Sequence, residues 1–240
     1  MNVYWLEQLE IDVPEENDWL SGSESATLST LRFAKRRADW RLGRWTAKRA
    51  LASYLDLPAQ AHVLERIEIR PATSGAPVGF FANQPADVAI SLSHRSNRAI
   101  CAVAAYGADL GCDLEMIEPH SDAFVADYFT AEEQELVARA SLADKSLLQA
   151  LLWSAKESAL KALQTGLRLD TRLVIASLGN ASPDINGWSP LQVRYTDRLF
   201  HGWWQQAGGM VRTIVAAPKP NPPCRLTTPD YFTDAAPICA

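Results

Sequence analysis

The sequence lacks the features that would mark a membrane-spanning, disulfide-bonded or nucleic-acid-binding protein. None of its apolar runs approaches the roughly 18 residues that a transmembrane helix needs. Its formal net charge is −5, so the chain as a whole has no bulk attraction for nucleic acid or an anionic membrane. We therefore predict no nucleic-acid partner and no membrane partner, and any anion-binding site must be a local basic patch.

Cysteine is also scarce. The four cysteines are Cys101, Cys112, Cys224 and Cys239, and none has the C-x-x-C spacing of a zinc or redox motif. Cys101 and Cys112 lie in apolar, strand-like runs, which predicts buried thiols rather than a disulfide framework. Residues 1–17 have neither a basic start nor an apolar stretch, so we predict no signal peptide and a reducing, cytoplasmic location.

The pattern of apolar residues predicts an α+β fold. Strands are expected at 3–12, 63–71, 87–94, 98–107, 108–119, 171–179, 191–197 and 208–217. Residues 24–57 predict one long helix or two, residues 130–140 a helix with a Thr130/Glu133 capping box, and residues 73–86 a Gly/Pro loop. The order suggests two similar halves at 1–108 and 109–217, followed by a Pro-rich tail at 218–240.

A predicted helix over 148–164 has more than one apolar side. Its apolar arc contains Leu148, Leu151, Leu152, Ala155, Ala159, Ala162 and Leu163. Trp153, Lys156, Glu157 and Leu160 fall on another side, where a plain surface helix would place no Trp and Leu. This second side is therefore expected to pack against another part of the protein. The charged residues beside these apolar groups suggest a partly enclosed site.

The segment G-C-D-L-E at 111–115 places two carboxylates on one face of a predicted strand, because residues two apart in a strand point the same way. Asp113 and Glu115 would repel each other unless a cation or hydrogen-bond donors lie between them. A hard cation such as Mg²⁺ suits such a pair. The alternative is a solvated strand face.

Glu157 and Lys161 are four residues apart on the helix and suit an ion pair. The alternative is a surface pair that contributes only a few tenths of a kcal/mol. Glu157 is a candidate third carboxylate for the metal, and Lys156 and Lys161 are candidates to hold phosphate oxygens.

Two further features suggest an anion site in the first half. Ser93 and His94 end a predicted strand, where the histidine either donates to a phosphate or is simply a structural side chain. Basic residues form a stripe along the helical stretch, and they are Arg37, Arg41, Arg44 and Lys48. An anionic partner would relieve their repulsion; the alternative is a solvated face paired with scattered acids.

Together these motifs resemble the 4′-phosphopantetheinyl transferase superfamily, in its surfactin-synthetase-activating class. The family pattern G-x-D-x-E is matched by Gly111, Asp113 and Glu115, and W-x-x-K-E-x-x-x-K is matched at 153–161. The upstream S-H motif is matched by Ser93 and His94. The resemblance covers roughly residues 30 to 216, with the motifs in family order.

The resemblance implies a function and an architecture. Such enzymes move the phosphopantetheine arm of coenzyme A to a serine of an acyl or peptidyl carrier protein and release adenosine 3′,5′-bisphosphate. It also implies a monomeric pseudo-dimer of two α+β halves, with coenzyme A in the cleft between them. Which carrier is modified stays open.

The resemblance also implies roles for individual residues. Asp113, Glu115 and Glu157 would hold Mg²⁺, while Lys161 and His94 would contact phosphate oxygens. Lys156 would help to activate the serine, and Glu133 is the best match to a second candidate base. The remaining implied coenzyme A contacts are Arg37, Arg44, Lys48, Gly75, Pro77 and Ser93.

One position departs from the family pattern. The G-K-P loop is S-G-A-P here, so Ala76 stands where the family often has lysine. One phosphate contact is therefore missing or comes from elsewhere, such as the arginine stripe. Two rival functions use the same residues: a non-catalytic carrier-binding relative, and a Mg²⁺-dependent phosphohydrolase.

Overall fold

The computed structural model describes residues 1–179, 181–228 and 231, and it confirms a mixed α+β fold with three sheets. The chain divides into two compact units. We call Tyr4–Tyr106 with the chain from Cys224 onward the N-terminal unit, and Met1–Val3 with Gly107–Pro223 the C-terminal unit. Each is described by itself.

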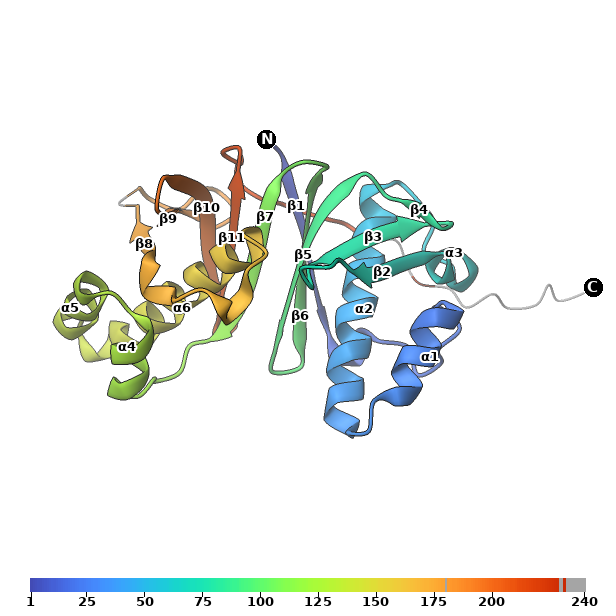
Figure 1. The fold of residues 1–240 in the computed structure, drawn as a ribbon, viewed down its shortest axis with the longest axis horizontal. Coiled ribbons are helices and arrows are strands. Elements are labelled where there is room, and N and C mark those ends of the chain that lie inside the picture. The colour runs from blue at the N-terminus through green and yellow to red at the C-terminus, as the bar shows by residue number, and fades with distance from the viewer. Residues whose placement is uncertain (180, 229–230, 232–240) are drawn as a thin grey trace, which may run out of the picture. The chain divides into compact units, whose positions relative to one another are not determined.

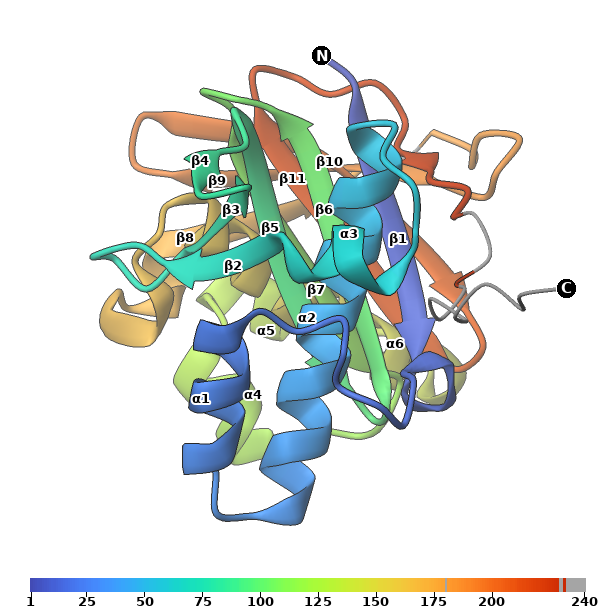
Figure 2. The ribbon, with the colours of Figure 1, turned by 90° about the vertical axis from the view of Figure 1, so that its right-hand side faces the viewer.

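The N-terminal unit packs its longest helix against a sheet. Its elements are β1 (Val3–Leu9), η1 (Glu10–Asp12), α1 (Gly22–Thr30), α2 (Ala34–Tyr54), α3 (Ala61–Glu65), β2 (Ile67–Pro71), β3 (Pro77–Phe81), β4 (Gln84–Pro85), β5 (Val88–Arg95), β6 (Arg98–Ala105) and β12 (Cys224–Arg225). The strand orders are β12-β1-β6-β5 and β2-β3-β4. Figure 2 shows α2 lying across β6, with α1 beside its first turns. Trp45 and Leu51 of α2 are buried in the resulting core.

The C-terminal unit is a five-stranded antiparallel sheet with helices on it. Its elements are β7 (Asp109–Met116), α4 (Asp122–Tyr128), α5 (Ala131–Arg139), α6 (Leu142–Ala162), η2 (Gly166–Arg168), η3 (Thr171–Leu173), β8 (Val174–Leu178), β9 (Ser189–Tyr195), β10 (Arg198–Ala207) and β11 (Met210–Ala217). The strand order is β7-β11-β10-β9-β8. Helix α6 lies against β7 and β11 (Figure 1).

On the second side of α6, Trp153 packs against the short helix α4 rather than facing solvent. The Trp153 ring lies 5.1 Å from the Phe124 ring and 5.0 Å from the Tyr128 ring, both in edge-to-face geometry. Leu160 is buried in the same cluster. Edge-to-face contacts add to the burial of apolar area, so these rings fix α4 on α6. The prediction that this side packs against something is therefore confirmed for Trp153, whose neighbour is α4.

Several predicted elements are confirmed and some are wrong. Residues 24–57 form two helices, and the Thr130/Glu133 capping box starts α5 as predicted. The predicted loop at 73–86 is wrong in part, because it contains β3 and β4. The strand β10 and the helix α4 were not predicted.

The cysteines and the tail can be followed only in part. Cys101 and Cys112 are buried thiols as predicted, Cys224 is an exposed thiol, and Cys239 lies outside the described residues. Within the tail at 218–240, β12 pairs in parallel with β1, with Cys224 opposite Tyr4. Across the described part of the chain, no helix combines the length and apolar character needed to cross a membrane.

Candidate active site

Strand β7 comes unusually close to helix α6, and Gly111 makes this possible. A Cβ at residue 111 would lie 1.8 Å from the backbone oxygen of Ser158. Because the obstacle is helix backbone, no larger residue fits without moving α6 away from the strand. Two residues after this contact stands Asp113, so the glycine places the following carboxylates close to α6.

Asp113 and Lys161 form an ion pair between β7 and α6. The Lys161 ammonium lies 2.7 Å from Asp113 Oδ1 and also donates to the Cys112 carbonyl at 3.1 Å. Asp113 is only 3% exposed. Burial by itself would lower the pKa of Lys161, but the surrounding groups, Asp113 foremost and Glu157 among them, together outweigh it and the pKa is raised. Lys161 therefore stays charged beside a buried carboxylate.

Glu157 lies one helical turn before Lys161 and is partly buried. Its pKa is raised from the usual value, first by burial and then by the negative charge of Asp113, with Lys161 acting in the opposite direction. Two carboxylates thus influence each other across the contact between β7 and α6. A cation bound to both would relieve the repulsion, and carboxylate oxygens are the ligands that Mg²⁺ prefers.

The third predicted carboxylate, Glu115, stands two residues beyond Asp113 in β7 and is partly exposed. It pairs in register with Val211 as Asp113 pairs with Thr213, so both carboxylates belong to the same face of the strand. Nevertheless, no cluster of three or more His, Cys, Asp or Glu side chains is close enough to hold a metal anywhere in the described residues. The chemistry of Asp113 and Glu157 fits a magnesium ion, while a complete ligand set stays a prediction.

Lys156 and Glu133, predicted to be catalytic, form a separate pair in the core. The Lys156 ammonium lies 2.8 Å from Glu133 Oε2, and its side chain is fully buried. It also donates to the carbonyls of Thr171 and Val174, at 2.9 and 2.5 Å. Burial lowers the pKa of Lys156 more than Glu133 raises it. These contacts favour a structural role, and the catalytic roles stay predictions.

In the N-terminal unit, two of the predicted coenzyme A residues, Lys48 and Arg44, lie beside the carboxylate of Glu24, which was not identified from the sequence. Lys48 is fully buried and lies 2.5 Å from Glu24, while Arg44 lies 3.7 Å from the same side chain. Burial lowers the pKa of both Lys48 and Arg44, and Glu24 opposes that effect. A ligand that met Lys48 would have to break these contacts.

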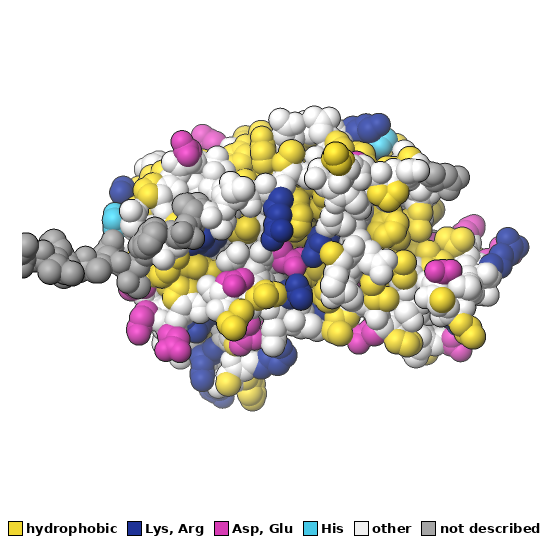
Figure 3. Space-filling view, turned by 180° about the vertical axis from the view of Figure 1, so that it is seen from behind, with side chains coloured by type: hydrophobic (Ala, Val, Ile, Leu, Met, Phe, Trp, Pro, Cys, Tyr) yellow, Lys and Arg dark blue, Asp and Glu magenta, His cyan; other side chains and the backbone are white. Residues whose placement is uncertain are grey.

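Of the three basic residues of α2 in the predicted coenzyme A set, Arg37 is the exposed one. It is exposed in the first turn of α2 and donates to the carbonyls of Leu31 and Arg32 at 3.3 and 3.4 Å. Figure 3 shows the Lys and Arg side chains gathered over this end of α2. The exposed cations there are Arg32, Lys35, Arg36 and Arg37. The N-terminal end of α2 is thus a local basic patch on a chain of negative net charge.

The remaining predicted residues also lie in the N-terminal unit. Ser93 and His94 stand near the end of β5, where His94 is exposed and pairs in register with Ala99. Gly75, with φ +90°, makes the turn between β2 and β3, and Pro77 begins β3. A positive φ favours glycine, which explains the residue at that turn.

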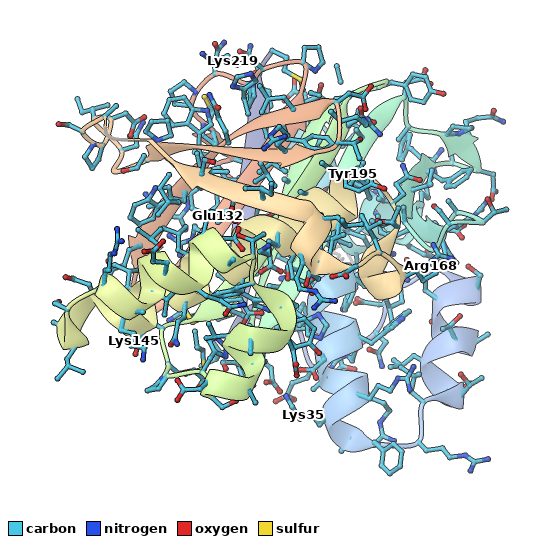
Figure 4. The ribbon with its side chains drawn as sticks, turned by 60° about the vertical axis from the view of Figure 1, so that its left-hand side comes forward. Lys35, Glu132, Lys145, Arg168, Tyr195 and Lys219 are labelled. Carbon is cyan, nitrogen blue, oxygen red and sulfur yellow. The ribbon has the colours of Figure 1, made fainter. Side chains whose placement is uncertain are left out.

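Residues that sequence reasoning missed hold α6 on the sheet. Ser158 and Ser154 Oγ lie 2.7 and 2.9 Å from Thr213 Oγ1 of β11, and all three hydroxyls are buried. Hydroxyls inside a core need such partners. The signal available was three small polar residues in otherwise apolar segments. Figure 4 shows the neighbouring helices, with Glu132 on α5 and Lys145 near the start of α6.

Comparison with known families gives one match. Residues 109–208 match the family model described as the 4′-phosphopantetheinyl transferase superfamily. The matched region runs from the start of β7 to the turn after β10, and it contains Asp113, Glu157 and Lys161. No curated protein matches the chain.

Proposed function

We propose that the chain moves the 4′-phosphopantetheine group of coenzyme A to a serine of an apo acyl or peptidyl carrier protein, as an enzyme of the superfamily whose model residues 109–208 match. The observation that carries the proposal is the contact between β7 and α6, which brings Lys161 and the Glu157 charge to the buried Asp113. We place the chain in the surfactin-synthetase-activating class, on the motifs around Ser93, His94 and Arg37.

The reaction is an attack by the carrier serine hydroxyl on the phosphorus that bears the pantetheine arm. A new P–O bond forms, the bridging P–O bond of the pyrophosphate breaks, and adenosine 3′,5′-bisphosphate leaves while the hydroxyl proton is lost. Negative charge on the phosphate oxygens must be neutralised and the reactants positioned. Lys161 supplies one fixed positive charge at this place.

Magnesium is the cofactor that the carboxylates fit. Asp113 and Glu157, with Glu115 on the same strand face, would hold the ion, which when bound neutralises pyrophosphate charge as a Lewis acid. The chain's own residues do the rest: Gly111 lets β7 approach α6, and Lys161 holds Asp113 in place. The side chains proposed for coenzyme A are Arg37, Arg44, Gly75, Pro77, Ser93 and His94. Lys48, which the resemblance also implied, already donates to Glu24 and to two carbonyls, so we do not propose it as a coenzyme A contact.

The test is incubation of the protein with coenzyme A, Mg²⁺ and a panel of apo carriers, read by carrier mass. A gain of one phosphopantetheine supports the proposal. Coenzyme A cleaved with no carrier modified would indicate a phosphohydrolase, and carrier bound with no product would indicate a binding relative. Asp113→Asn and Glu157→Gln should abolish transfer while circular dichroism shows a retained fold. Near-normal rates in either variant would refute the carboxylate assignment.

A further inference from the structure

The two units contain the same buried lysine arrangement. Residues 45–48 read W-T-A-K in α2, and residues 153–156 read W-S-A-K in α6, two helices of 21 residues each. In both helices the lysine of this tetrapeptide is fully buried. Fully buried lysines are rare, because the ammonium must leave water, so two at the same place in a repeated tetrapeptide point to a common purpose.

In the C-terminal unit the lysine joins three elements. Glu133 Oε2 accepts from the Thr130 N–H at 2.8 Å, and Oε1 accepts from the Ala176 N–H of β8 at 3.0 Å. The same carboxylate accepts from Lys156, whose other two contacts are the carbonyls of Thr171 and Val174. Helix α6 is thereby tied to the start of α5 and to β8.

In the N-terminal unit the arrangement is similar, with a capping glutamate, a strand N–H and two carbonyls, but the Trp19 carbonyl precedes the capped helix, whereas Thr171 and Val174 both follow α6. Glu24 caps α1 by accepting from the Ser21 N–H at 3.2 Å, and it accepts from the Ile69 N–H of β2 at 3.2 Å. Lys48 contacts Glu24 and donates to the carbonyls of Trp19 and Leu64, at 2.8 and 3.1 Å. Here α2 is tied to the start of α1 and to β2.

The strand order around the two arrangements also corresponds. In the N-terminal unit the neighbouring strands run β1-β6-β5, and in the C-terminal unit they run β7-β11-β10, so that β1 corresponds to β7, β6 to β11 and β5 to β10. The first strand after the long helix, β2 or β8, pairs with the next one, β3 or β9. The lysines therefore occupy corresponding places in two similar strand orders, although β2 and β3 form a separate sheet in the N-terminal unit.

Each ammonium has its donors accounted for. A lysine has three N–H donors, and each of these lysines has one carboxylate and two carbonyls as acceptors. No donor is left over for a phosphate or for the carrier serine. A second copy in α2, where the residue after the lysine is Arg49 rather than a glutamate, shows that the device does not depend on the carboxylate chemistry of α6.

We propose that Lys156 and Glu133 are positioning residues, which fix α6 so that Glu157 and Lys161 stand beside Asp113, and that Lys48 and Glu24 are the same device in the other unit. The inference rests on the proposed function, since it assigns how that site is held. It replaces a direct part for Lys156 and Glu133 in proton transfer by a purely geometric one. Groups that orient metal ligands typically change metal affinity or activity by about 10–100-fold when removed.

The experiment compares Lys156→Met with Lys48→Met, because each lysine has one carboxylate and two carbonyls as acceptors and only Lys156 precedes a proposed metal ligand. Both variants should melt roughly 10 °C below wild type, since each leaves a buried glutamate without its cation. Lys156→Met should weaken Mg²⁺ binding, measured by calorimetry without substrate, by about 10-fold or more. Lys48→Met should leave Mg²⁺ affinity within about 2-fold of wild type.

Two controls lie beside the pair. Lys145→Met removes a partly exposed lysine from the first turn of α6, and Glu132→Gln changes the exposed neighbour of Glu133 in the first turn of α5. Both should leave the melting temperature and Mg²⁺ affinity unchanged. If Lys156→Met does not fold, Glu133→Gln takes its place, because glutamine keeps the size of the side chain and one acceptor oxygen. The kcat and KM of phosphopantetheine transfer are then measured separately for this variant.

Two results overturn the inference. One is a folded Lys156→Met or Glu133→Gln with wild-type Mg²⁺ affinity and kcat lowered 1000-fold or more, which would mark a catalytic group. The other is a melting temperature that matches the Lys145→Met control. A wild-type chain that binds no Mg²⁺ and modifies no carrier refutes the proposed function instead, and the unfolding comparison of Lys156→Met, Lys48→Met and Lys145→Met then decides by itself whether the two pairs are one device.

Discussion

Lys161 of α6 and Asp113 of β7 hold a strand and a helix together through a 2.7 Å ion pair, in which the carboxylate is 3% exposed. Removing one partner of a buried pair leaves the other charge uncompensated, which typically costs about 3–5 kcal/mol. The Lys161 side chain is 26% exposed, so solvent screens part of this cost and brings it to the lower end of that range or below it.

Lys161→Met should therefore lower the free energy of unfolding by roughly 2–3 kcal/mol in urea denaturation at neutral pH. Lys161→Arg keeps the positive charge, so its free energy of unfolding should fall by less. The comparison variant is Lys145→Met, on the same helix, whose ammonium is 4.0 Å from an exposed Asp122. Equal stability of Lys161→Met and Lys145→Met would show that the pair contributes nothing.

The raised pKa of Glu157 gives the second prediction, a pH dependence. A carboxyl whose pKa is higher in the folded state than in the unfolded state favours folding in its protonated form. Its contribution is present below the ordinary value of 4.5 and is lost as pH rises through that value toward the raised one. Glu157→Gln removes this term, so the variant should become more stable relative to wild type as pH rises from 4 to 8.

Magnesium should reverse the stability difference between Glu157→Gln and wild type at high pH. A cation that binds the ionised carboxylates stabilises the folded chain by mass action, so Mg²⁺ should raise the wild-type melting temperature more at pH 8 than at pH 5. Glu157→Gln should lose most of this Mg²⁺-dependent shift. An identical shift in variant and wild type would show that Mg²⁺, if it binds, does so elsewhere.

Gly111 gives the third prediction. Gly111→Ala should destabilise the chain severely, by roughly 3 kcal/mol or more, because its Cβ would lie 1.8 Å from the Ser158 oxygen and the helix backbone must move. It should also lower transfer, since β7 and α6 carry Asp113 and Glu157. Gly43→Ala is the matched control: nothing lies within 4 Å of its added Cβ, and an alanine inside α2 should stabilise by up to about 1 kcal/mol. Thermal unfolding of both variants checks the contrast.

The sequence predicted that Asp113 and Glu115 share a strand face and that Glu157 and Lys161 lie one helical turn apart, because alternation in a strand and the period of a helix are local rules. It predicted an ion pair between Glu157 and Lys161, whereas Lys161 pairs with Asp113 across the contact between helix and strand. It predicted less about Lys48 and Lys156. Their carboxylate partners, Glu24 and Glu133, stand on other helices, and which long-range neighbour a lysine meets is decided by packing. The capping box at Glu133 was visible in the sequence, but the N–H of Ala176 that completes the carboxylate's contacts was not.

The missed elements have local reasons. Pro77 and the turn at Gly75 made residues 73–86 read as a loop, yet Pro77 is the first residue of β3 and faces Pro71 at the end of β2, where a missing N–H costs little. Strand β10 alternates Phe200 and Trp204 on one face, but Gly202 interrupts the pattern. Helix α4 has only seven residues, too few for a periodic signal.

The basic end of α2 gives the last prediction, which separates binding from structure within the predicted coenzyme A set. Arg37 is exposed and donates only to nearby backbone, whereas Lys48 is fully buried against Glu24. Arg37→Ala should therefore leave stability within about 0.5 kcal/mol of wild type, as surface changes usually do. If Arg37 contacts the 3′-phosphate, the variant should lose about 10–100-fold in kcat/KM for coenzyme A, the effect of one charge-assisted hydrogen bond.

The substrate that lacks this phosphate sharpens the measurement. With 3′-dephospho-coenzyme A, Arg37→Ala and wild type should have nearly equal kcat/KM, because the contact is absent in both. Arg139→Ala, which removes an exposed arginine paired only with Glu135, controls for the loss of a surface positive charge. An equal loss with both substrates would show that Arg37 acts through the general field of the basic patch. No loss with either would remove it from the coenzyme A site and leave the neighbouring exposed cations of α2 as the next to test.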